Sequence, residues 1–160
     1  MSRAELARRQ AELVSALVGE EAAPPGFDGS RVRTAAAALR AKRSNAIARA
    51  WPQLARALGP EFPSVVEQHV RRMPSAPSSG PPGDGRTLAA WLAAKGRLPW
   101  EGRLELAAAN IRYRWPADGR RLPRRVGGAV VWRRSPVELV AALRLPGLGE
   151  RWLRLPITRR

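Results

Sequence analysis

The spacing of apolar residues changes abruptly after Asn110, and this change constrains the fold more than any other feature of the chain. Before Asn110, apolar residues recur every three or four positions, which is typical of amphipathic helices. After it, they alternate with arginines, as in Ile111-Arg112-Tyr113-Arg114-Trp115, which is typical of strands. We therefore predict an α+β protein, in which an N-terminal helical bundle is followed by a small C-terminal antiparallel β-sheet.

The pattern before Asn110 divides into several helices. Asp28 or Ser30 can cap the second helix, and Pro52 suits the first turn of the third. The segment Pro74–Gly85 holds four Pro, three Ser and three Gly, which predicts a flexible loop. Helices are expected over residues 2–18, 30–51, 53–58, 62–73, 86–95 and 99–110. We expect two domains, a helical one over residues 1–98 and a second, helix plus antiparallel sheet, over residues 99–160.

Four strands are expected in the second domain, and the first of them is the alternating segment of residues 111–115. Val130 and Trp132 alternate with Val131 and Arg133, and Leu153, Leu155 and Ile157 are opposed by Trp152 and Arg154. Residues 137, 139, 141, 143 and 145 share one face of a further strand. The sequence Pro146-Gly147-Leu148-Gly149 is typical of a turn, so it predicts a hairpin between the last two strands.

Positive charge is concentrated in the predicted sheet. The chain carries 29 Lys and Arg against 13 Asp and Glu, a formal net charge of +16, which attracts anionic partners. Residues 112–134 alone hold eight arginines against the single Asp118, with Tyr113, Trp115 and Trp132 interleaved. These aromatic residues either stack on nucleic-acid bases or form the core face of a sheet whose arginines are solvated. The strict alternation favours the core interpretation.

Residues that carry out catalysis are scarce. The chain has no cysteine, and its one histidine, His69, lies at helical spacing between Val65 and Met73, which is typical of a packed core residue. Glu101 and Glu105 are four residues apart on one predicted helix, as in an acid–base or metal pair, but the flanking Arg97 and Arg103 favour ion pairs. No nucleotide-binding or hydrolase motif occurs. The sequence therefore predicts no catalytic residue, no bound metal and no cofactor.

The apolar segments are too short for a membrane or a secretion signal. Glu5 and Glu12 interrupt the apolar pattern of the first helix, and no apolar run exceeds about six residues, far fewer than a membrane span needs. We therefore expect a cytoplasmic protein without a membrane partner.

Two parts of the sequence resemble known families. Residues 31–62, with Trp51-Pro52 and Leu58-Gly59-Pro60-Glu61-Phe62, resemble a widespread bacterial helical domain family assigned to DNA binding, and Leu88–Leu98 resembles its closing helix. Trp51 stands where that family usually has Phe. The whole chain, with the ending Leu143–Pro156, is similar to an actinobacterial family related to the small subunit of methanobactin oxazolone synthase.

The second resemblance implies a partner role. Such small subunits bind a TIM-barrel multinuclear iron oxidase and the leader of a ribosomally synthesised peptide, while the barrel holds the iron and modifies the peptide. By this resemblance, the chain would be a non-catalytic accessory subunit that needs no cofactor of its own. The alternative is a nucleic-acid-binding protein that places Arg40, Arg43 and the strand arginines on phosphates. Weak, non-specific binding of nucleic acid is expected from the charge alone.

The C-terminal sheet is the predicted site of peptide binding. A small open sheet leaves an edge whose unpaired N–H and C=O groups can accept an extended peptide as an added strand. Arginines beside that edge favour an acidic leader, and pockets between Tyr113, Trp132 and Trp152 would select apolar side chains. The predicted peptide-binding residues are Arg112, Tyr113, Arg114, Trp132, Arg133, Arg134 and Trp152.

Overall fold

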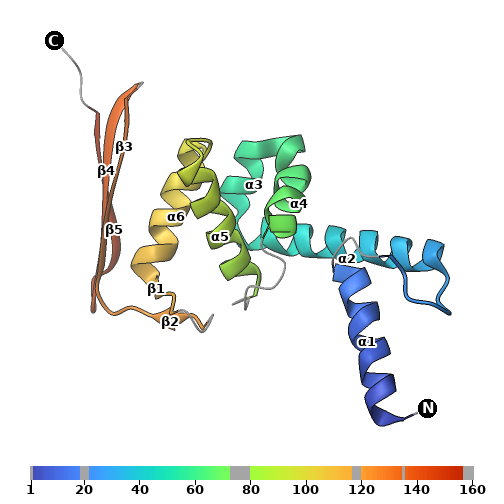
Figure 1. Ribbon diagram of the computed structural model, residues 1–160. Helices are drawn as coiled ribbons and strands as arrows, with labels where there is room; N and C mark the ends of the chain where they lie inside the picture. The colour runs from blue at the N-terminus through green and yellow to red at the C-terminus, as the bar shows by residue number, and fades with distance from the viewer. Residues whose placement is uncertain (1, 19–21, 73–79, 117–119, 135, 157–160) are drawn as a thin grey trace. The chain divides into compact units, whose positions relative to one another are not determined.

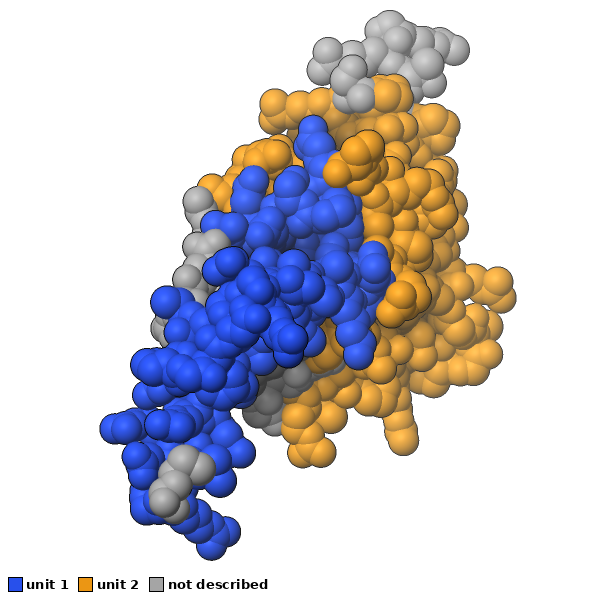
Figure 2. Space-filling model, turned by 90° about the vertical axis from the view of Figure 1, so that its right-hand side faces the viewer, with its two compact units in different colours: residues 1–46, 61–76 blue, residues 47–60, 77–160 orange. Residues whose placement is uncertain are grey.

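The computed structural model describes residues 2–18, 22–72, 80–116, 120–134 and 136–156 (Figure 1). Helices occupy the N-terminal part and small antiparallel sheets follow, so the predicted α+β fold is confirmed. The chain forms two compact units (Figure 2), residues 1–46 with 61–76 and residues 47–60 with 77–160, which cut across the predicted division at residue 98. The elements are α1 (Arg3–Val18), α2 (Gly29–Ala50), α3 (Pro52–Leu58), η1 (Gly59–Glu61), α4 (Phe62–Arg72), α5 (Pro81–Ala94), α6 (Trp100–Arg112), β1 (Tyr113–Arg114), β2 (Leu122–Pro123), β3 (Gly127–Arg134), β4 (Val137–Leu145) and β5 (Gly149–Pro156).

The first unit contains α1, α4 and most of α2. Asp28, rather than Ser30, caps α2, because its carboxylate accepts the backbone N–H groups of Ser30 at 2.8 Å and Arg31 at 3.3 Å. The Ser30 hydroxyl also donates to Asp28, and this hydrogen bond holds the pKa of the carboxyl below its ordinary value. His69 is buried on α4, as predicted for a core residue, whereas Met73, predicted in the same helix, lies outside the described residues.

The helical part of the second unit is closely packed around Trp51. Leu54 of α3 and Leu88 and Leu92 of α5 are fully buried with it. The Trp51 indole Nε1 donates to the backbone oxygen of Pro82 at 3.0 Å. Gly85 lies so close to the same indole that a Cβ atom there would overlap the ring. Residue 85 is therefore held to glycine by its packing.

Helix α5 begins earlier than its composition suggests. We expected residues 74–85 to form a loop, but Pro81 to Gly85 are helical. Proline is tolerated in a first helical turn, where its missing N–H has no intrahelical partner to lose. The rest of the expected loop, apart from Gly80, lies outside the described residues. Helix α6 also extends further than expected, so Ile111, predicted in a strand, is helical and buried.

The main sheet has the strand order β3-β4-β5, and both pairs are antiparallel. The hairpin predicted between the last two strands is confirmed, since β4 ends at Leu145 and β5 begins at Gly149. Helix α6 lies beside one face of this sheet (Figure 1) and packs on β3 and β4. The approach is closest at Gly127, where a Cβ atom would collide with the Ile111 carbonyl. Tyr113 and Arg114 instead pair with β2 in a separate two-stranded ladder.

Candidate binding site on the C-terminal sheet

The strand register divides the main sheet into two chemically different faces. Val140 and Ala142 point towards α6 and are buried. The inner face consists of these two residues with Gly127, Ala129, Val131, Arg133, Glu138, Arg144, Glu150, Trp152, Arg154 and Pro156. The outer face consists of Gly128, Val130, Trp132, Arg134, Val137, Leu139, Ala141, Leu143, Leu145, Gly149, Arg151, Leu153 and Leu155.

Trp132 and Arg133 have the opposite placement from the one that we expected. The alternation predicted an aromatic core face and a solvated arginine face. Instead, Trp132 is 54% exposed on the outer face, and Arg133 lies on the half-buried inner face. Arg133 is accommodated there because its Nη2 pairs with Glu138 at 2.8 Å and its guanidinium lies 4.9 Å from the Trp100 ring centre. Alternation identifies two faces of a strand but does not decide which face is covered.

Arg112 of α6 and Glu150 of the inner face form the shortest of the ion pairs that involve the described residues of the sheet. The Nε and Nη2 atoms of Arg112 donate to the two carboxylate oxygens of Glu150 at 2.6 Å and 2.9 Å. Trp152 Nε1 donates to the same carboxylate at 2.6 Å. The hydrogen bonds from Arg112 lower the pKa of Glu150, and the same contact raises the pKa of Arg112. This pair joins the end of α6 to the start of β5.

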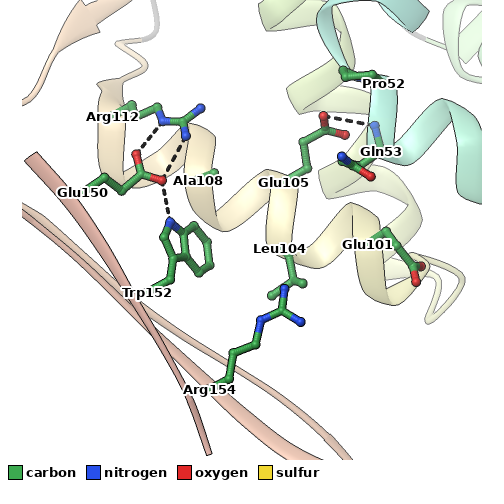
Figure 3. Close-up of a pocket in the computed structure, with 10 residues that line it drawn as sticks. All are labelled: Pro52, Gln53, Glu101, Leu104, Glu105, Ala108, Arg112, Glu150, Trp152 and Arg154. Atoms are coloured by element: carbon green, nitrogen blue, oxygen red, sulfur yellow. Dashed lines mark hydrogen bonds and ion pairs between the residues drawn. The ribbon is translucent and has the colours of Figure 1, made fainter.

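A cavity of about 530 Å³ lies under the inner side of β5 (Figure 3). Trp152 and Arg154 project into it from β5, and Leu104 and Ala108 come from α6. Its remaining lining is Pro52, Gln53, Glu101, Glu105, Arg112 and Glu150. The cavity thus combines an apolar wall with arginines and carboxylates, which suits a side chain of a bound peptide.

Glu105 in this cavity has a structural partner that the sequence did not reveal. Its carboxylate accepts the backbone N–H groups of Leu54 at 2.8 Å and Gln53 at 3.2 Å, so it caps the N-terminus of α3. Burial raises the pKa of Glu105 above its ordinary value, against the lowering effect of these hydrogen bonds. The expected pairing with Arg103 is therefore replaced by a cap, and Arg103 Nε donates instead to the Leu98 carbonyl at 3.3 Å.

β5 is an edge strand with little cover. Because β5 is last in the order β3-β4-β5, one side of its backbone has no neighbouring strand among the described residues. Helix α6 packs on β3 and β4, and β5 is exposed along almost its whole length. A peptide added to this edge would alternate its side chains in step with β5. Side chains opposite Trp152 and Arg154 would then point towards the cavity.

The structure brings only some of the predicted peptide-binding residues together. Arg112 and Trp152 line the cavity. Trp132 and Arg134 lie on the outer face, where the Arg134 guanidinium is 5.3 Å from the Trp132 ring centre. Trp132 and Trp152 are on opposite faces, so they do not share the expected pocket.

The remaining predicted residues have other surroundings, and eight of the ten residues that line the cavity, Arg154 among them, were not predicted as peptide-binding. Arg133 is held by Glu138, and Tyr113 and Arg114 form β1, with the Arg121 guanidinium 4.5 Å from the Tyr113 ring centre. Arg154 was not predicted in the site, although its two-residue spacing from Trp152 is a signal that could have placed it there.

The described residues contain no group of three or more His, Asp or Glu side chains arranged to hold a metal ion. In the same parts of the chain, no helix has the length and apolar character needed to cross a membrane.

The helical part of the chain identifies its family. Residues 7–94 match the family described as SCO6045-like, C-terminal domain, and the chain therefore belongs to that family. The match ends with α5, so α6 and the sheets lie outside it. No curated protein matches the chain. No solved structure matches it either.

Proposed function

We propose that the chain is a non-catalytic accessory subunit that holds an extended peptide against β5 while a larger enzyme modifies that peptide. The observation that carries this proposal is the outer edge of β5, which pairs with no further strand among the described residues, above the cavity lined by Trp152 and Arg154. Main-chain hydrogen bonds at such an edge give affinity for an extended segment, and the side chains beside it give selectivity.

The resemblance to the methanobactin oxazolone synthase small subunit suggests the two partners. The larger enzyme would be a TIM-barrel multinuclear iron oxidase, and the peptide would be the leader of a ribosomally synthesised precursor. The iron would belong to the oxidase, and the work would take place in the cytoplasm. In this proposal the chain contributes binding and orientation, and it needs no cofactor.

The cavity suggests which leader sequence would bind. A residue that points inward near Leu104 and Trp152 would be apolar, because that wall of the cavity is apolar. The inward residue two positions away would be acidic, because it would meet Arg154. The Arg154 side chain is 65% exposed and its ion pair with Glu138 is long, at 3.9 Å, so its charge is accessible to a ligand. An acidic and an apolar residue separated by one position are therefore the expected leader pattern.

Calorimetry of the full chain with a synthetic peptide that carries an acidic and an apolar residue separated by one position tests this proposal. Arg154→Ser should weaken binding about tenfold and reduce its salt dependence, because a charge pair at the site is lost. Arg151→Ser is the matched control, since Arg151 lies on the same strand but on the outer face. Arg112 and Arg133 are unsuitable, because they form the closest ion pairs of Glu150 and Glu138, at 2.6 Å and 2.8 Å.

Hydrogen exchange gives the second measurement. The leader should slow exchange of the β5 backbone amides, because edge addition pairs them. Equal affinity of the Arg154→Ser and wild-type chains, without protection of β5, would exclude the edge as the peptide site. The full chain is needed, because truncation after Asn110 would remove the buried Ile111 from the end of α6.

Nucleic-acid binding is a second candidate, which rests on the arginines around the β1–β2 ladder. Arg114, Arg120, Arg121, Arg124 and Arg125 are all exposed there. Phosphate contacts release counterions, so purely electrostatic binding of duplex DNA should weaken steeply with rising salt. A sequence-selective DNA complex that persists at physiological salt would favour this candidate over the accessory subunit.

A further inference from the structure

The outer face of the main sheet exposes a cluster of large apolar side chains. Val130 is 66% exposed, Leu153 58% and Trp132 54%, and Leu143 and Leu155 beside them are also exposed. These residues come from all three strands, so they form one continuous surface. Contiguous apolar surfaces of this kind mark sites of interaction, whereas isolated exposed apolar residues are ordinary.

The charges of the sheet separate by sign between the two faces. Both carboxylates, Glu138 and Glu150, lie on the inner face, where arginines pair with them. On the outer face the only charged residues are Arg134 and Arg151, among the described positions of the three strands. The outer face is thus an apolar surface with positive charge and no negative charge. A surface complementary to it is apolar and carries carboxylates at its rim.

We propose that this outer face is the docking surface for a second protein, whose own contact surface is apolar with an acidic rim. Trp132, with Arg134 stacked against it at 5.3 Å, is the expected centre of the contact, because Trp and Arg dominate binding energy at interfaces. This inference rests on the proposed function, under which the docked protein is the larger, peptide-modifying enzyme. The peptide edge of β5 and the docking face would then use the same sheet in two perpendicular directions.

The size of the face indicates that the arginines must take part. Eight residues along a strand and three strands across it give a planar area of roughly 27 Å by 14 Å, or about 380 Å². This is near half of the about 800 Å² that each partner contributes to a standard interface. The contact therefore extends past the apolar centre onto the basic surroundings. There, acidic residues of a partner would strengthen binding and basic residues would weaken it.

A second copy of the chain fits this surface poorly. Each copy carries a formal net charge of +16, and a face-to-face pair would bring Arg134 and Arg151 of each copy near arginines of the other. Like charges across an interface disfavour association. A peptide strand does not fit either, since its backbone hydrogen bonds require a sheet edge and not a face.

The test measures binding of the full chain to a purified TIM-barrel multinuclear iron oxidase from the organism that encodes the chain. The paired substitution Val130→Ser with Leu153→Ser should weaken this binding roughly 30-fold, as expected when the centre of an interface is lost. Leader binding should stay unchanged in Val130→Ser alone, because Val130 lies on β3, two strands away from the β5 edge. The matched control is Leu6→Ser with Val14→Ser on α1, where the two residues are 42% and 57% exposed.

Each outcome separates the two proposals. If the oxidase binds the outer-face variant as tightly as wild type, or if only the α1 variant loses binding, the docking face is refuted and the accessory function stands. If the wild-type chain binds no oxidase, the accessory function fails, and this occupant of the face fails with it. Light scattering that shows a wild-type dimer, dissociated by the Val130 and Leu153 substitutions, would also refute the proposal, because a second copy would then cover the face.

Discussion

The helical core around Trp51 and the three-stranded sheet use their apolar residues in different ways. In the helical core, Leu54, Leu88 and Leu92 are fully buried. In the sheet, the buried apolar residues are Val140 and Ala142, while larger side chains such as Trp132 and Leu153 are exposed. Burial of these side chains in the helical core stabilises the fold, because it removes their apolar area from water. The sheet leaves such area available for a partner.

The largest expected effect tests the close packing of the helical core. In an ordinary helix interior, Gly→Ala stabilises by about 1 kcal/mol. Gly85→Ala should instead destabilise the chain by about 3 kcal/mol, because the new Cβ overlaps the Trp51 indole. Denaturant unfolding of the full chain measures this change.

The control for Gly85→Ala removes the Trp51 side chain, which is the group that the new Cβ atom would overlap. In a Trp51→Ala background, which keeps no side-chain atom beyond Cβ at position 51, the methyl group added at residue 85 should cost far less. A double-mutant cycle that shows simple additivity would disprove the packing explanation.

Glu105→Ala should have the next largest effect, a loss of about 1.5 kcal/mol in the free energy of unfolding. The substitution removes the acceptor of the Leu54 and Gln53 amides at the start of α3. Glu105→Gln is the control, since its amide oxygen can still accept one of the two N–H groups. Equal stability of the two variants would contradict the capping role.

Glu150→Gln should cost about 1 kcal/mol near neutral pH, reduced by the solvent exposure of Arg112. The native pKa of Glu150 lies below its ordinary value of 4.5. The stability from this pair is therefore fully present above pH 4.5 and is lost as the pH falls through the lowered native pKa. Thermal unfolding at several pH values should show a smaller acid sensitivity for Glu150→Gln than for wild type. An unchanged acid dependence would count against the pair.

The smallest change in the free energy of unfolding is expected for substitutions on the exposed outer face of the sheet. The Val130→Ser and Leu153→Ser pair should change the free energy of unfolding by less than about 0.5 kcal/mol at each position, because exposed positions contribute little to folding. Denaturant unfolding beside Val140→Ser, which alters a buried residue of the same sheet, gives the contrast. Strong destabilisation by the outer pair would mean that the outer face is covered within the folded chain.

The sequence was sufficient for the parts of the fold that depend on local pattern. Apolar spacing predicted the helices, and Pro146-Gly147-Leu148-Gly149 predicted the β4–β5 hairpin. The start of α5 was missed because Gly85 was interpreted as part of a loop. Its real role is to make room for the indole of Trp51, which lies far away in the sequence. The role of Glu105 was missed for the same reason, since its partners are 51 and 52 residues away.

The site was predicted less completely than the fold. Arg112 and Trp152 do line the cavity, but Trp132 does not lie near them. Period-two alternation separates Trp132 from Arg133 without deciding which of them faces α6. That choice depends on where α6 packs, and no local pattern contains this information.

The arginines of β5 also affect whether the chain aggregates while no partner is bound. An exposed edge strand with Leu153 and Leu155 is a template for uncontrolled strand-to-strand aggregation. Arg151 and Arg154 interrupt its apolar residues, and Pro156 at its end lacks an N–H to donate. A second β5 strand, equally basic, is repelled from this edge, whereas an acidic peptide is attracted to it. The same charges thus disfavour aggregation between copies of the chain and favour binding of a negatively charged ligand.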